Sequence, residues 1–140
     1  FQGACQPLAD ILDLKIKWMQ WPALDFAPAP DWGRNRTVLI GDAAHASLPY
    51  LAQGAAMALE DACVLSSAIE NADELEAAFR KFSGSRFART SEIQKRSRQL
   101  GNIDQARGAL RRSRNAALKA TPRRSFIKRM SWIYDWQQEE

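Results

Sequence analysis

The residues best placed for chemistry lie in segment 37–62, where an apolar run leads through a turn and a proline loop into a helix. Residues 38–40, Val-Leu-Ile, predict a short buried strand that Gly41 and Asp42 end. Ligands of α/β sheets bind at strand ends, and glycine lets the chain turn tightly there. The Asp42 carboxylate could accept hydrogen bonds from the hydroxyl groups of a polyol. It could equally cap a turn, and spacing alone does not separate the two.

A second group of interest follows where the proline loop meets a helix. Pro49 fixes one φ angle and lacks an N–H, so it shapes the loop. Gln53 and Gly54 then begin a predicted helix, whose first amide groups are unpaired and carry partial positive charge. These amides could stabilise an anion, or a ring oxygen that gains negative charge on reduction. An ordinary helix start has the same sequence pattern.

The other polar residues near this segment are expected to be structural. His45 is the only histidine, and we expect a hydrogen-bonded packing residue rather than a base. Of the acidic pair Glu60 and Asp61, we expect one member in solvent and the other paired with a basic helix. Three aromatic side chains either belong to the core, which we favour, or line a pocket for a planar substrate: Trp18, Trp21 and Tyr50.

The elements that must position these residues are mostly helices. A short helix is predicted over 6–14 and a half-buried strand over 15–21, where polar and apolar residues alternate. Prolines then keep the chain extended up to the strand at 38–40. A helix runs from Gly54 to about residue 72, because the segment is rich in Ala, Leu, Met and Glu.

Further helices are predicted to the end of the chain. One begins near Asp73, and residues 83–85, Ser-Gly-Ser, are expected to break it from a long arginine-rich helix that reaches residue 102 or beyond. Gly108 marks another joint. Thr121 and Pro122 are expected to act as the N-cap and first residue of the last helix. Two strands alone do not make a stable open sheet, so the pattern suggests missing partners.

Composition limits the classes of protein. The length of 140 residues suits one domain, and no apolar run is long enough to cross a bilayer, so no membrane partner is expected. The two cysteines, Cys5 and Cys63, form no metal-binding pattern and suggest reduced core thiols of a cytoplasmic protein. With a single histidine, no metal site is predicted.

Charge is distributed unevenly along the chain. Residues 80–129 hold 16 of the 20 Lys and Arg but only two acids, whereas the first 79 residues hold 11 acids and four bases. This asymmetry is compatible with a nucleic-acid-binding module. It also fits a basic half that packs against an acidic surface outside the chain, and solvated helix faces are the commoner origin of such arginine clusters.

Segment 38–62 resembles a known motif. Val-Leu-Ile-Gly-Asp-Ala-Ala-His at 38–45 and Leu-Pro-Tyr-Leu-Ala-Gln-Gly-Ala-Ala-Met-Ala-Leu-Glu-Asp-Ala at 48–62 resemble the second flavin-binding motif of FAD-dependent aromatic hydroxylases. These are the single-component flavoprotein monooxygenases, and the likeness is greatest to salicylate-hydroxylase-like members. Segments 18–25, 94–98 and 132–134, together with Gly101, extend the resemblance over nearly the whole chain.

The resemblance implies roles for particular residues. After Gly41, Asp42 would hold a ribityl hydroxyl of FAD, and the Pro49 loop would lie beside the isoalloxazine ring. The backbone amides of Gly54, Ala55 and Ala56 would meet the pyrimidine edge of the ring. No individual side chain is assigned as catalytic. NAD(P)H would be the co-substrate and a small aromatic compound the substrate.

The family also has parts that this sequence does not show. It begins with a strand–GxGxxG–helix unit for the ADP part of FAD, and no such glycine pattern occurs here. We therefore expect the C-terminal portion of a larger monooxygenase, an α/β fragment that is mostly helical. Residues 1–36 would end the substrate-domain region, and 37–140 would form the C-terminal part of the FAD-binding domain. Alone it should hold a partial FAD site and be inactive.

Two other hypotheses stay open at this point. The basic helices could form an interaction module that binds nucleic acid, which we consider the weaker alternative. Another flavoprotein, such as an epoxidase, a halogenase or a reductase, could share the same ring-binding motif. An apolar face left uncovered by the missing N-terminal portion would promote self-association.

Overall fold

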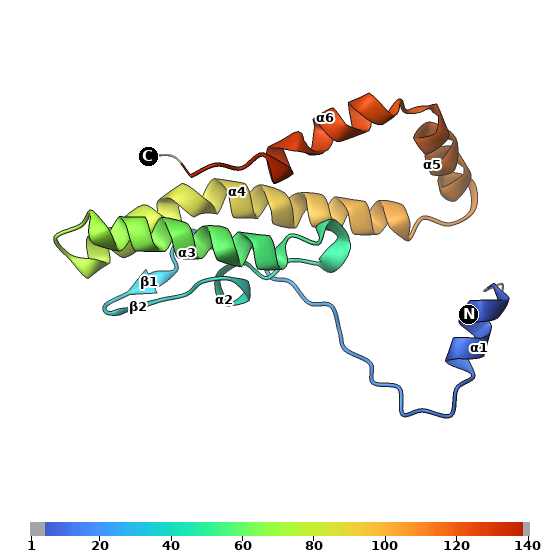
Figure 1. The fold of residues 1–140 in the computed structure, drawn as a ribbon, viewed down its shortest axis with the longest axis horizontal. Helices are drawn as coiled ribbons and strands as arrows, with labels where there is room; N and C mark the ends of the chain where they lie inside the picture. Colours follow the sequence, from blue (N-terminus) through green and yellow to red (C-terminus); the bar gives the residue numbers. More distant parts are fainter. Residues whose placement is uncertain (1–4, 139–140) are drawn as a thin grey trace.

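Two long helices form the body of the chain. The computed structural model describes residues 5–138. Helix α3 (Gly54–Glu70) and helix α4 (Leu75–Asp104) are joined by a short turn and lie side by side (Figure 1). The predicted helix at 54–72 is thus confirmed almost to the residue. Its composition explains this, because Ala, Leu, Met and Glu lose little side-chain entropy in a helix.

Helix α4 is continuous where a break was predicted at residues 83–85. Ser83 donates a hydrogen bond to the Phe79 carbonyl and Ser85 to the Phe82 carbonyl, so both hydroxyls bond within the helix. One glycine costs a helix only about 1 kcal/mol. The buried side chains on either side of it, Phe82 and Arg86, anchor both halves of α4 and outweigh that cost.

A small hairpin precedes the helical pair. Strands β1 (Gly33–Arg34) and β2 (Thr37–Val38) are antiparallel, with Gly33 opposite Val38 and Arg34 opposite Thr37. The predicted strand at 38–40 is therefore displaced: β2 ends at Val38, although the Leu39 amide still donates to the Trp32 carbonyl. Leu39 and Ile40 are exposed rather than buried. No further strand covers them within residues 5–138.

The N-terminal segment differs from its prediction. Helix α1 (Gln6–Leu12) forms close to the expected place, but the predicted strand at 15–21 is wrong, and the chain there has no regular structure. Alternation of polar and apolar residues fits a strand only when a partner supplies the ladder of hydrogen bonds. Figure 1 shows α1 at the end of an extended linker, away from the helical pair. The aromatic side chains of Trp18 and Trp21 are exposed, so the core position favoured for them is wrong.

The core consists of two clusters of buried side chains. One lies where the hairpin and the short helix α2 (Asp42–His45) meet the helical pair, and contains Trp32, Ala44, Ala68, Ala78, Phe79 and Phe82. The other lies near the start of α3 and contains Leu51, Met57, Ile93 and Ile133. The cysteines belong to neither, because Cys5 and Cys63 are exposed thiols, which corrects the expectation of core residues.

Two further helices complete the chain. Helix α5 (Gly108–Ala120) begins at Gly108, as predicted, and α6 (Arg123–Tyr134) then runs back along α4 (Figure 1). Thr121 does not cap α6, because its hydroxyl donates to the Ala117 carbonyl and so closes α5, while Pro122 takes the N-cap position. Among the described residues, no helix combines the length and apolar character needed to span a bilayer.

Candidate functional site

The structure brings the two candidate groups of the sequence together. Asp42 is the first residue of α2 and Gly54 the first of α3, and a Cβ atom placed on Gly54 would lie 3.7 Å from Asp42 Oδ1. Asp42 is exposed, so its carboxylate is open to a ligand. A hydrogen-bond acceptor and the start of a long helix therefore lie within reach of one bound molecule.

The first amides of α3 are available to such a molecule. The Met57 amide donates to the Gln53 carbonyl at 2.9 Å and is the first in the helical ladder. The amides of Gly54, Ala55 and Ala56 precede that ladder, and no side chain caps this end of the helix. Together they present donors and partial positive charge. Ala55 is exposed and Ala56 half-buried, so neither side chain seals this end of α3.

Gly41 directs the chain into this arrangement. Its φ of 57° and ψ of −139° lie in a region that is open to glycine and strained for other residues. The Gly41 amide donates to Asp61 Oδ2 at 2.9 Å, and its carbonyl accepts from the Ala44 and His45 amides. This turn ends the extended segment after β2 and begins α2, and so it places Asp42.

A buried network of charged groups lies beneath the site. His45 Nε2 donates to Asp61 Oδ2 at 2.6 Å, and Arg86 Nε donates to Asp61 Oδ1 at 2.8 Å. His45 is 1% exposed and its ring lies 5.2 Å from that of Trp32. It is the hydrogen-bonded packing residue that was expected, and its burial removes it from contact with a ligand.

The acidic pair does not divide as predicted, because Glu60 and Asp61 are both buried. Glu60 pairs with Arg86 at 2.7 Å and with both Nε and an outer nitrogen of Arg89. Arg89 also donates to the carbonyls of Trp132 and Ile133, which ties α6 to the body. The prediction failed because it assumed a basic partner for only one of the two acids. Helix α4 supplies two arginines, Arg86 and Arg89, about one turn apart.

These partners set the protonation of both acids. Burial alone would raise the pKa of Asp61, but hydrogen bonds from His45, the Gly41 amide and Arg86 outweigh it and lower the pKa below its usual value. Burial opposes ionisation of Glu60 in the same way, and Arg89 and Arg86 again lower the pKa. Both groups are therefore carboxylates at neutral pH and hold α2, α3, α4 and α6 together.

The proline loop rests on α4. Pro49 opens the short 3-10 helix η1 (Pro49–Leu51), and Ala52 follows with a φ of 52°. The Tyr50 ring lies against Gly101, and its hydroxyl accepts a hydrogen bond from Gln105. Tyr50 is half-buried and packs on α4, in agreement with the structural role favoured for it. These contacts were not predicted from the sequence. Small or neutral residues recur on one face of the arginine-rich helix, and this pattern could have indicated a packing surface there.

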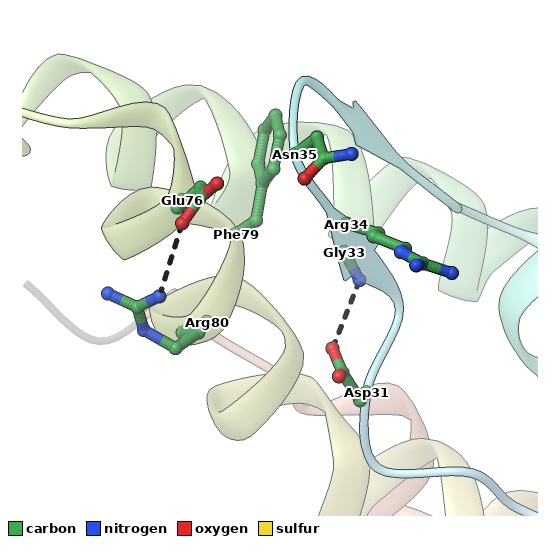
Figure 2. A pocket seen from close by; sticks show the side chains of 7 residues that line it. All are labelled: Asp31, Gly33, Arg34, Asn35, Glu76, Phe79 and Arg80. Carbon is green, nitrogen blue, oxygen red and sulfur yellow. Dashed lines mark hydrogen bonds and ion pairs between the residues drawn. The ribbon is translucent and has the colours of Figure 1, made fainter.

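A cavity of about 240 Å³ lies elsewhere, between the hairpin and the first turns of α4 (Figure 2). In Figure 2 the Arg80 side chain pairs with Glu76, and the Asp31 carboxylate accepts from the Gly33 amide. Asp42 and Gly54 do not line it. The charged groups around this cavity are mixed in sign, and it shows no set of converging donors comparable to the start of α3.

Comparison with known proteins decides the family. The family described as "FAD binding domain" matches residues 7–78, just over half of the chain. The chain belongs to the FAD binding domain family. The resemblance noted in the sequence is thereby confirmed, and the mostly helical, partial form of the fold agrees with the extent of the matches below.

Relatives of this FAD binding domain chain include named hydroxylases. It is 39% identical over 137 residues to the 3-hydroxybenzoate 6-hydroxylase of Polaromonas naphthalenivorans, covering 97% of this chain and 34% of that protein. It is 45% identical over 97 residues to the 6-hydroxynicotinate 3-monooxygenase of Bordetella bronchiseptica, covering 68% of this chain and 25% of the relative. The chain thus spans about a third or less of the length of these relatives.

A solved structure agrees with the family. Klebsiella pneumoniae HpxO, complexed with FAD and uric acid, is similar with a TM-score of 0.71 and 27% identity, covering 76% of this chain and 28% of that one. The candidate site fits part of FAD on chemical grounds. A carboxylate can accept from the ribityl hydroxyls, and free amides can donate to the ring's oxygen and nitrogen atoms. When bound, FAD supplies the redox chemistry, and the protein supplies binding, orientation and electrostatics.

Proposed function

We propose that this chain forms the flavin-ring half of an FAD-dependent, NAD(P)H-using monooxygenase that hydroxylates a small aromatic substrate. The observation that carries the proposal is the approach of the Asp42 carboxylate to the first residue of α3. The relatives named above act on 3-hydroxybenzoate and on 6-hydroxynicotinate, so the substrate class is a hydroxylated ring that carries a carboxylate.

Within this proposal each predicted residue has a separate task. Asp42 accepts hydrogen bonds from a ribityl hydroxyl, and the turn at Gly41 aims it. The amides of Gly54, Ala55 and Ala56 face the pyrimidine edge of the ring and stabilise negative charge there. The loop with Pro49 lies beside the isoalloxazine and excludes water from it. The other part of the FAD site, and most of the substrate site, belong to the missing N-terminal portion. The division of the chain at residues 36 and 37 stays a prediction.

A chimera tests the proposal directly. The matching segment of the Polaromonas naphthalenivorans 3-hydroxybenzoate 6-hydroxylase is replaced by this chain, and the purified protein is assayed for bound FAD and for substrate-dependent oxidation of NADH and NADPH. We expect a yellow protein with turnover. A folded chimera without FAD would overturn the proposal. The isolated chain is expected to bind FAD weakly and to show no turnover, and hydroxylation by it alone would contradict the assignment to half a site.

Asp42→Ala in the chimera tests the residue assignment. Loss of hydrogen bonds to a charged acceptor costs about 1.5–3 kcal/mol, so FAD should bind roughly 10- to 100-fold more weakly. Asp73→Ala is the matched control, because Asp73 is an exposed acid in the turn between α3 and α4. If both variants change the Kd for FAD equally, Asp42 has no specific role.

A further inference from the structure

One face of α4 holds the loop that separates Asp42 from α3. Three residues of α4 and its C-cap residue touch this loop, and they recur three or four positions apart, which places them on one face of the helix. They are Gln94, Ser97, Gly101 and Gln105. None of them is charged, although the rest of α4 is rich in arginine. The loop is therefore fixed by neutral hydrogen bonds and close packing rather than by ion pairs.

Gln94 joins the loop to the N-terminal linker. Its Nε2 donates to the Ala46 carbonyl at 2.8 Å and to the Phe26 carbonyl at 3.3 Å, and the side chain is 0% exposed. Its Oε1 is buried without a partner among the residues that the structure describes. A buried amide with one unpaired end stabilises the fold poorly. The evident effect of Gln94 is to hold two backbone segments at a fixed separation.

Ser97 and Gly101 hold the next part of the loop. Ser97 is also fully buried, and its hydroxyl donates to the Leu48 carbonyl, directly before Pro49. A Cβ atom on Gly101 would lie 2.4 Å from Cε2 and 2.8 Å from Cδ2 of Tyr50. Only glycine at this position therefore lets the Tyr50 ring rest on the helix.

We propose that Gln94, Ser97 and Gly101 are positioning residues, which fix loop 46–51 and thereby the separation between the Asp42 carboxylate and the amides of α3 that meet the flavin. The loop connects these two groups, so movement of the loop would change the distance that one bound ring must match. The inference rests on the proposed function for its flavin part, whereas the fixing of the loop stands on geometry alone.

Hydrogen exchange of the 140-residue chain tests the loop first. Gln94→Met keeps the length of the side chain but removes the Nε2 donors and the unpaired Oε1. We expect amide exchange in segment 46–53 to quicken about tenfold, while exchange in the middle of α3 and α4 stays unchanged. Gln99→Met is the matched control, because Gln99 is exposed on the same helix. Unchanged exchange in the loop, or equal quickening throughout α3 and α4, would overturn the inference.

A second pair of variants tests the contact of the ring with glycine. Gly101→Ala should displace Tyr50 and quicken exchange in the loop. Introduced together with Tyr50→Ala it should add nothing, since the clash is with the ring. If Gly101→Ala has the same effect with and without the ring, Gly101 acts through the helix itself and is not a positioning residue.

The flavin part is tested in the chimera by absorbance and by FAD titration. Gln94→Met should weaken FAD binding about tenfold and shift the flavin absorption bands, whereas Gln99→Met should change neither. FAD binding and spectrum unchanged by Gln94→Met would overturn the flavin role. Failure of the proposed function is recognised differently, by an unmodified chimera that holds no FAD.

Discussion

The body and the tail of this chain use the same basic residue types in opposite ways. In the body, Arg86 and Arg89 are buried or half-buried and bind Glu60 and Asp61. In the tail, α5 has no buried residue, and the nine bases between 107 and 129 have no acid among them in the sequence. One set of arginines holds helices together. The other, apart from Arg114, which donates to the carbonyls of Ile103 and Asp104, is a solvated, positively charged surface.

The charge asymmetry of the sequence therefore has two separate causes. Arg86 and Arg89 of α4 pair with the acids of α3, so the acidic first half and the basic second half are partly complementary within one chain. The basic residues left to interact with something else are exposed bases of α5 and α6, together with Lys81 and Lys95 of α4. The alternative of a nucleic-acid-binding module depends on that remainder alone, and the family match does not favour it.

Arg86→Met is expected to have the largest effect on stability. Removing one partner of a buried ion pair costs about 3–5 kcal/mol, because the other charge is left buried without compensation. Here two carboxylates, Asp61 and Glu60, lose a shared partner. The change should appear as a large fall in the urea midpoint of unfolding.

Arg112→Met is the matched control in the tail. Arg112 is exposed on α5, and its replacement should change the free energy of unfolding by no more than about 0.5 kcal/mol. A comparable loss in both variants would mean that the tail is as closely packed as the body.

Acid should weaken the body next. The pKa values of Asp61 and Glu60 are lowered by folding, so their contribution to stability is present above the ordinary carboxyl pKa of about 4 and is lost as pH falls below it. Unfolding followed by circular dichroism should show stability that is level near neutral pH and falls below about pH 4. In Arg86→Met the fall should be shallower, because without the guanidinium the folded-state pKa values of both acids rise toward those of the unfolded chain. If stability depends on pH in the same way with and without Arg86→Met, the ion pairs of Asp61 and Glu60 do not cause the loss of stability in acid.

The helical body and the meeting of Asp42 with Gly54 could be predicted from sequence because local signals agree with the tertiary packing. Gly41 permits the tight turn that ends the extended segment, and the helix formers after Gly54 favour a helix. The prediction of a strand at 15–21 was wrong, because alternation with a period of two gives a strand only where a partner strand is present. The fully buried arginine at position 86 was also invisible, since burial of arginine depends on where the acids of α3 face.

Ala52→Gly should raise the free energy of unfolding slightly, whereas Arg86→Met should lower it strongly. Ala52 follows η1 with φ 52° and ψ 36°, a left-handed conformation that costs a non-glycine residue about 1 kcal/mol or more. Glycine removes this strain but adds freedom to the unfolded chain, so a net stabilisation of about 0.5 kcal/mol is expected in urea unfolding. Exchange in segment 46–53 should not quicken, because the contacts to α4 remain. Net destabilisation would show that Ala52 contributes packing that outweighs its strain.

Two variants at the boundary between body and tail are expected to have the smallest effects. Glu92 and Arg96 form an exposed pair at 2.6 Å within α4, and Arg96 also lies 4.5 Å from the ring centre of Trp132 on α6. Glu92→Gln removes only the surface ion pair and should cost about 0.3–0.5 kcal/mol, less in high salt. Arg96→Ala removes the contact with the ring as well and should cost about 0.5–1 kcal/mol more. Exchange of the α6 amides separates the two: it should quicken in Arg96→Ala and not in Glu92→Gln. If neither variant affects α6, the hydrogen bonds from Arg89 and the packing of the buried Ile133 hold α6 to the body.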